Sequence, residues 1–243
     1  MQRVSTWLGN AIARYLQVPS RDYVPFNVTP ANRLRAALVP GDVLLVEGNL
    51  RISRAIKYLT HSTWSHAAFY TGGPPGAELI EADLTEGVQR VGLSEYSHLN
   101  TRICRPVRLL PEDLARVIDY MEASLGRSYD LKNVIDLARY LFPTPPVPVH
   151  FRRRMLALGS GDPTRAICST LIAEAFQAVR YPILPEKHYI TDGAARRELL
   201  HIRHHSLFTP RDFDLSPYFE VIKPTLALGF DYRQVEWDGG PPG

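Results

Sequence analysis

Two residues far apart in the chain have the types and settings that nucleophilic catalysis by a thiol requires. Cys168 lies near the start of the segment ICSTLIAEAFQAV, and His66 heads the short run HAAFY. The apolar spacing of the first segment predicts a helix, and the unpaired N–H groups at a helix start favour a thiolate. A histidine beside that sulfur would accept its proton, which makes Cys168 the candidate nucleophile and His66 the candidate general base.

A thiol and an imidazole act together when a third polar group fixes the ring. Glu81 is the candidate, because it lies inside the strand-like segment ELIEAD, where a buried carboxylate needs a polar partner. If Glu81 faces solvent instead, Asp83 or Asp130 would have to orient His66. The second cysteine, Cys104, lies in the middle of a predicted strand and is expected to be a buried, unreactive thiol.

The elements that position these residues are predicted to be short strands and amphipathic helices. Apolar runs bounded by turn residues indicate the strands, two of which form a hairpin around Thr85, Glu86 and Gly87. Sequential strands of this kind pair antiparallel, so the predicted fold class is α+β. Strands are expected at residues 41–48, 66–70, 78–83, 87–93 and 101–110, and helices at 31–38, 49–62, 111–126, 129–142 and 167–179. Residues 143–166 are predicted as a long loop, and the chain after the last helix as loops that end in a strand near FEVI.

Composition narrows the class of protein further. The chain has 243 residues, of which 45% are hydrophobic and 22% charged, which is typical of a globular domain. Its 28 basic and 25 acidic residues nearly balance, so we expect no nucleic-acid partner, and the basic run at 151–155 is interpreted as a solvated face. Two cysteines cannot form a disulfide framework, which favours a reducing compartment.

The N-terminal residues 1–38 are predicted to form a helical extension to a domain at residues 39–225, with a tail at 226–243. Val4, Leu8 and Ile12 recur at helical spacing in the first segment. Neither a signal peptide nor a transmembrane segment is expected, so the predicted location is cytoplasmic or peripherally membrane-associated. The helix is expected to pack on the domain, and peripheral membrane contact is the alternative.

The order of the motifs resembles a known family. The segments GDVLLVEGN, STWSHAAFYTG, LIEAD followed by GV, GRSYD and CSTLIAEAF are similar to those of circularly permuted NlpC-type papain-like proteins, in particular the bacterial YiiX/YaeF-like branch. Lecithin retinol acyltransferase is a more distant relative. In ordinary papain-like enzymes the cysteine helix precedes the histidine strand, whereas here His66 precedes Cys168 by 102 residues. The resemblance covers residues 40–225.

The resemblance implies a permuted papain-like fold, in which an antiparallel sheet or barrel packs against the helix that carries the nucleophile. It assigns Cys168 as nucleophile, His66 as general base and Glu81 as orienting group, with the backbone N–H of Cys168 in the oxyanion hole. Tyr129 in GRSYD matches a tyrosine that this branch brings near the site. Ser65 and Ser169, the neighbours of His66 and Cys168, are expected to support the site or the substrate.

The implied function is a thiol hydrolase or acyltransferase that forms an acyl-enzyme on an amide or isopeptide bond, such as that of a cell-wall peptide. A lipid ester is the second substrate class, and a non-catalytic module that binds a small peptide or acyl ligand in the same pocket is the alternative. No cofactor is expected. His201 and His205 in HIRHH have helical i, i+4 spacing, but no third ligand accompanies them, so no metal site is predicted.

Overall fold

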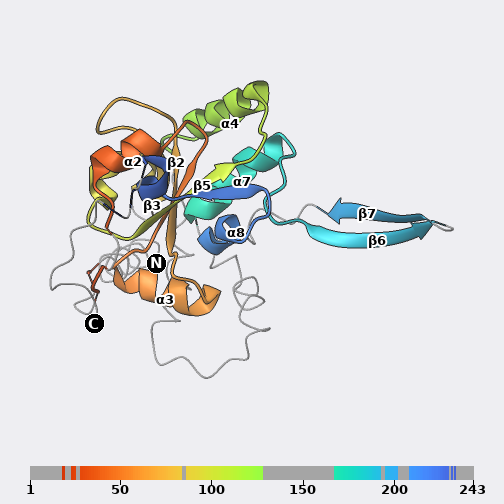
Figure 1. Cartoon of the computed structure of the whole chain (residues 1–243), viewed down its shortest axis with the longest axis horizontal. Helices are drawn as coiled ribbons and strands as arrows, with labels where there is room; N and C mark the ends of the chain where they lie inside the picture. Colours follow the sequence, from red (N-terminus) through yellow and green to blue (C-terminus); the bar gives the residue numbers. More distant parts are fainter. Residues whose placement is uncertain are drawn as a thin grey trace, which may run out of the picture.

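A six-stranded antiparallel sheet forms the centre of the protein (Figure 1). The computed structural model describes residues 18–19, 23–25, 28–83, 86–127, 167–192, 195–201, 208–229, 231 and 233. The strands, in spatial order, are β4 (Gly87–Val91), β3 (Leu79–Asp83), β2 (His66–Tyr70), β1 (Val43–Val46), β5 (Thr101–Pro106) and β8 (Phe219–Ile222). The sheet is open, with β4 and β8 at its edges. The predicted α+β class is therefore confirmed, whereas the permuted papain-like topology stays a prediction.

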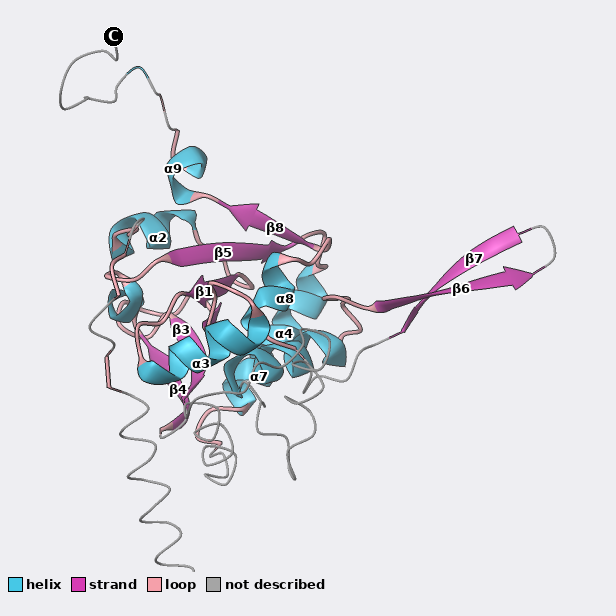
Figure 2. Cartoon of the chain, turned by 90° about the horizontal axis from the view of Figure 1, so that it is seen from below, coloured by secondary structure: helices cyan, strands magenta, loops and turns pink. Residues whose placement is uncertain are grey.

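Helices cover both faces of this sheet (Figure 2). One face, here called the α7 face, packs against α7 (Ile167–Ala178), α4 (Pro111–Ala123) and α8 (Pro210–Asp214). The other, the α2 face, packs against α2 (Ala31–Ala37) and the 3-10 turn η1 (Leu93–Tyr96). Helix α3 (Arg51–Thr60) joins β1 to β2, and α9 (Pro224–Ala227) contacts α2.

Strand β1 explains why the sheet needs two layers of helices. All four of its residues are buried: Val43 and Leu45 belong to the core on the α7 face, and Leu44 and Val46 to the core on the α2 face. Successive strand residues point to opposite faces, so a continuous apolar run can be stable only where both faces are covered. Helix α7 provides much of that cover through apolar side chains that include Leu171 and Phe176.

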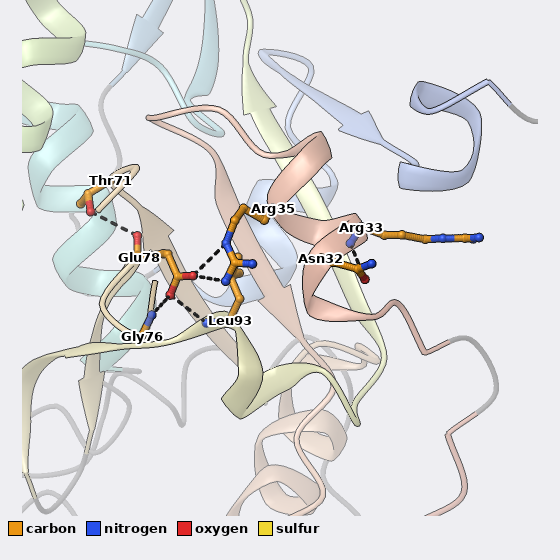
Figure 3. Close-up of polar contacts among 7 residues, drawn as sticks. All are labelled: Asn32, Arg33, Arg35, Thr71, Gly76, Glu78 and Leu93. Atoms are coloured by element: carbon orange, nitrogen blue, oxygen red, sulfur yellow. Dashed lines mark hydrogen bonds and ion pairs between the residues drawn. The ribbon is translucent and has the colours of Figure 1, made fainter. Parts of the chain in front are cut away.

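A buried carboxylate joins the connecting segments on the α2 face. Glu78 is 1% exposed, and its Oε1 accepts hydrogen bonds from the guanidinium of Arg35 on α2 (Figure 3). Its Oε2 accepts the backbone N–H groups of Gly76 and Leu93, at 2.9 and 3.3 Å. Burial alone raises the pKa of Glu78, but Arg35 and the backbone N–H donors outweigh that effect, so the pKa is lowered. The carboxylate thus fixes α2 and η1 relative to β3.

The C-terminal third departs from the sequence-based expectation. Instead of loops, a hairpin of β6 (Glu186–Asp192) and β7 (Ala195–His201) follows α7 and projects away from the six-stranded sheet (Figures 1 and 2). Helix α8 was also not expected; Thr209 and Asp212 form its capping box. The predicted helix at 129–142, the loop at 143–166 and the N-terminal helix lie outside the described residues. The last strand, β8, is confirmed.

Within the described parts of the chain, no helix combines the length and apolar character needed to cross a bilayer. This finding agrees with the expectation that the chain has no transmembrane segment there.

We predict that Glu78→Gln lowers the free energy of unfolding at pH 7 by about 2–3 kcal/mol, because charge-assisted hydrogen bonds to a buried group are lost. The folded-state pKa of Glu78 lies below its ordinary value of 4.5. The difference between parent and variant should therefore be complete above pH 4.5 and disappear as the pH falls through the folded-state pKa. Urea unfolding at several pH values measures it.

The matched control is Glu122→Gln, which removes an ion pair with Arg90 whose two side chains are each about one-third exposed. An exposed pair contributes little, so this variant should change stability by about 1 kcal/mol or less. Equal effects of the two substitutions would contradict the role given to Glu78.

Candidate active site

The register of the sheet brings His66 and Glu81 to the same face. His66 is the first residue of β2 and pairs with Val46, which faces α2. Glu81 lies two residues from Leu79 on β3, and Leu79 also belongs to the core on the α2 face. Its partner across the hairpin is Gln89 on β4. The three polar side chains therefore lie together on the α2 face, near the end of the sheet where β2 begins.

Their side chains form one connected hydrogen-bond network. His66 Nε2 lies 2.6 Å from Glu81 Oε2, and Gln89 Nε2 donates to Glu81 Oε1 at 3.1 Å. The hydroxyl of Tyr96, from η1, donates to Glu81 Oε2 and lies 3.1 Å from His66 Nε2. Both carboxylate oxygens are thus occupied by donors, and Glu81 is only 7% exposed.

Cys168 reaches the same imidazole from α7. It is the second residue of this helix, is 6% exposed, and lies close enough to His66 that its charge and hydrogen bonding raise the pKa of the ring. Because Nε2 of the ring is directed at Glu81, Nδ1 is the nitrogen left for the sulfur. The next residue, Ser169, is fully buried, and its hydroxyl donates to the backbone oxygen of Phe208 at 2.9 Å. This hydrogen bond joins the first turn of α7 to the segment that precedes α8.

The charges in this network favour an ionised carboxylate and a protonated ring. Burial raises the pKa of Glu81, but the charge of His66 and the three hydrogen bonds outweigh it and lower the pKa to about 2. Burial lowers the pKa of His66, whereas the Cys168 thiolate and then Glu81 raise it more strongly, so the pKa lies well above 6.5. At neutral pH the arrangement therefore stabilises an imidazolium between a carboxylate and the sulfur.

Cys104 has the opposite environment. It is fully buried in β5, and burial raises the pKa of its thiol far above the ordinary value. A thiolate at this position would lack solvation, which makes Cys104 a poor nucleophile. The structure agrees with the expectation that this cysteine is part of the core.

The other predicted site residues have different positions. Ser65 is buried, and its Oγ accepts the backbone N–H of Gly48 at 2.9 Å. A Cβ at Gly48 would lie 2.9 Å from this Oγ, so the turn after β1 and the residue before His66 pack closely. Tyr129 lies outside the described residues, as does Asp130. Asp83 accepts the backbone N–H of Glu86 and so stabilises the hairpin turn.

Two residues of the network were missed by sequence reasoning. Gln89 could have been found, because a hairpin turn centred on residues 84–86 places it opposite Glu81. Tyr96 gave no such signal, since it lies in a short 3-10 turn between β4 and β5 whose position depends on the tertiary fold. Its contact with Glu81 is visible only in three dimensions.

The histidine pair that was weighed as a metal motif is not helical. His201 ends strand β7, so the helical i, i+4 interpretation is wrong at this position, and His205 lies outside the described residues. Among the residues that the structure describes, no group of three or more His, Cys, Asp or Glu side chains is placed to hold a metal ion.

Comparisons with known proteins find similarity only at the level of solved structures. No family model matches the chain, and no curated protein matches its sequence. The chain is similar to the crystal structure of metalloprotein yiiX from Escherichia coli O157:H7, with a TM-score of 0.46 and 13% identity, over 77% of this chain and 97% of that chain. At this TM-score and identity the likeness defines neither the family nor the activity of this chain. The NlpC-type and lecithin retinol acyltransferase resemblances stay predictions.

We predict that iodoacetamide at pH 7 modifies Cys168 at least about tenfold faster than Cys104, because the first is paired with an imidazolium and the second is a buried thiol of raised pKa. Peptide mapping of partly alkylated, folded protein gives both rates. The same measurement in urea is the control, since unfolding should bring the two rates together. Equal rates in the folded protein would contradict the site.

Proposed function

We propose that this chain is a cysteine-dependent hydrolase or acyltransferase that acts on an amide or isopeptide bond. The observation that supports the proposal is the position of the His66 ring, which is hydrogen-bonded to Glu81 through Nε2 and has Cys168, at the start of α7, near enough to raise the pKa of the ring. A nucleophile, a base and an orienting group in hydrogen-bond contact are the requirements for activating a thiol.

In this proposal His66 takes the thiol proton of Cys168, and the sulfur forms a bond to the carbonyl carbon of the substrate. The backbone N–H of Cys168 stabilises the negative oxygen of the tetrahedral intermediate. Collapse breaks the bond between carbon and nitrogen while the imidazolium gives its proton to the departing amine. Water, or an acceptor amine, then attacks the thioester with His66 as base, which releases the acyl group and restores the thiol.

An amide is favoured over an ester by the charge state of the ring. An amine departs only if it receives a proton, whereas an alkoxide is a better leaving group and depends less on a general acid. Glu81 and Cys168 together raise the pKa of His66 well above 6.5, so the acid form of the ring is abundant at neutral pH. Cell-wall peptides and other small peptides contain such bonds. Lipid esters are the second substrate class.

The test is mass spectrometry of the full chain after incubation with a panel of peptide anilides, isopeptides and short-chain and long-chain nitrophenyl esters. We expect a mass increase equal to the acyl group on the peptide that contains Cys168, and release of that group on longer incubation. Cys104→Ala should retain the adduct, and Cys168→Ala should lose it.

The pattern of adducts separates the candidates. Turnover of anilides or isopeptides supports the amide class, and turnover of long-chain esters alone would replace it with the lipid class. Absence of any adduct, although Cys168 reacts with iodoacetamide, would contradict enzymatic function and leave a ligand-binding module.

A further inference from the structure

The hydroxyl of Tyr96 contacts both Glu81 and His66. Tyr96 comes from η1, a four-residue turn, and its hydroxyl lies 3.1 Å from His66 Nε2 and donates to Glu81 Oε2. That oxygen is also the partner of His66 Nε2, at 2.6 Å. The tyrosine and histidine rings are themselves neighbours, with centroids 5.8 Å apart and planes tilted by 42°.

We propose that Tyr96 is a positioning residue, whose hydroxyl holds the Glu81 carboxylate toward the His66 imidazole. The inference deepens the proposed function and rests on it, because it assigns Tyr96 a part in preparing the same thiol. Tyr96 itself exchanges no proton with the substrate in this account; it acts through Glu81.

Two donors on one oxygen could compete or cooperate, and the geometry favours cooperation. A carboxylate oxygen has two lone-pair directions, so one oxygen accepts both the phenol and the imidazole. The bond between His66 Nε2 and Glu81 Oε2 is short, at 2.6 Å, with Tyr96 on the same oxygen. The tyrosine therefore restrains the carboxylate without displacing the histidine.

Gln89 restrains the other oxygen. Its amide donates to Glu81 Oε1 from β4, while the Tyr96 hydroxyl donates to Oε2 from η1. A carboxylate held at both oxygens cannot rotate about its terminal bond without breaking a hydrogen bond in a buried setting. Without Tyr96, the Gln89 amide would still hold Oε1, but the only partner of Oε2 would be the His66 ring, which the carboxylate has to orient.

The phenol can serve as a donor over the whole working pH range. Burial and then the charge of Glu81 raise the pKa of Tyr96 well above 10, so its proton is retained. The groups that face His66 are Glu81 from β3, Tyr96 from η1 and Cys168 from α7, and Asp83 adds a negative charge near Tyr96. Of these, only Tyr96 is a neutral donor to the carboxylate.

The experiment follows the His66 ring resonances by NMR against pH in the full chain carrying Cys168→Ala, so that neither turnover nor the thiolate affects the result. The signal is assigned with a His66→Asn variant. In that background Tyr96→Phe removes only the hydroxyl and keeps the ring. The matched control is Tyr70→Phe, at a buried tyrosine on the same strand as His66 and in the core on the α2 face.

We expect the midpoint of the His66 titration to move to lower pH in Tyr96→Phe and to stay unchanged in Tyr70→Phe. With Cys168 present, Tyr96→Phe should slow alkylation at pH 6 about two- to tenfold, which corresponds to the loss of one hydrogen bond. An unchanged midpoint, or one moved to higher pH because the phenol had been competing with the ring, would overturn the proposal.

A second variant tests the proposal if Tyr96→Phe does not fold. If Tyr96→Phe melts below the measuring temperature, Gln89→Met removes the other restraint and should move the His66 midpoint in the same direction. If it does not, positioning of Glu81 by its donors is refuted. Because the readout is a titration in a chain without the nucleophile, these outcomes are independent of whether any acyl adduct forms on Cys168.

Discussion

The buried charge of Glu81 is the constraint on which the site depends. A carboxylate that is 7% exposed is stable only when donors replace the water it has lost, and three side chains from three elements do so here. One of these donors is His66, which is thereby fixed in orientation and stabilised in its charged form. The ring also adjoins Cys168, so in the proposed mechanism the nucleophile depends on Glu81 although the two side chains share no hydrogen bond.

The sheet provides the rigidity that such a network needs. His66, Glu81 and Gln89 are placed by the pairing of β2, β3 and β4, and the adjoining strand β1 is buried on both faces. Helix α7 packs on the opposite face from Glu81, so its first turn approaches His66 at the end of the sheet rather than through it. A ring at the first residue of a strand is accessible from both sides, which explains why it can join a carboxylate and a thiol.

The sequence was informative where short-range patterns determine structure. Apolar runs and turn residues predicted β1 to β5, and helical spacing predicted α7 with Cys168 at its start. The polar residue inside ELIEAD correctly suggested that Glu81 has a partner. Helix α8 could also have been predicted, because Thr209 and Asp212 have the spacing of a capping box.

Other features depend on contacts between distant segments. Strand β5 pairs with β1 and not with β4, the strand before it in the chain. This pairing and the position of Tyr96 depend on how η1 packs on the sheet, and no local sequence pattern predicts that packing. The hairpin of β6 and β7 was missed because its strands lack a clear alternation of apolar and polar residues. The roles of Ser65 and Ser169 in binding a substrate stay predictions.

The most direct test of the central claim is the pH dependence of Cys168 alkylation in Glu81→Gln, with Glu86→Gln in the adjacent turn as control. Glu86 is exposed in the hairpin turn, so its variant should reproduce the parent profile. Glu81→Gln keeps the size of the side chain and an acceptor oxygen but removes the charge that stabilises the imidazolium. We predict that its profile moves to higher pH, with alkylation about tenfold or more slower near pH 6. A profile that overlays the parent would contradict the account, because Cys168 would then be activated without Glu81.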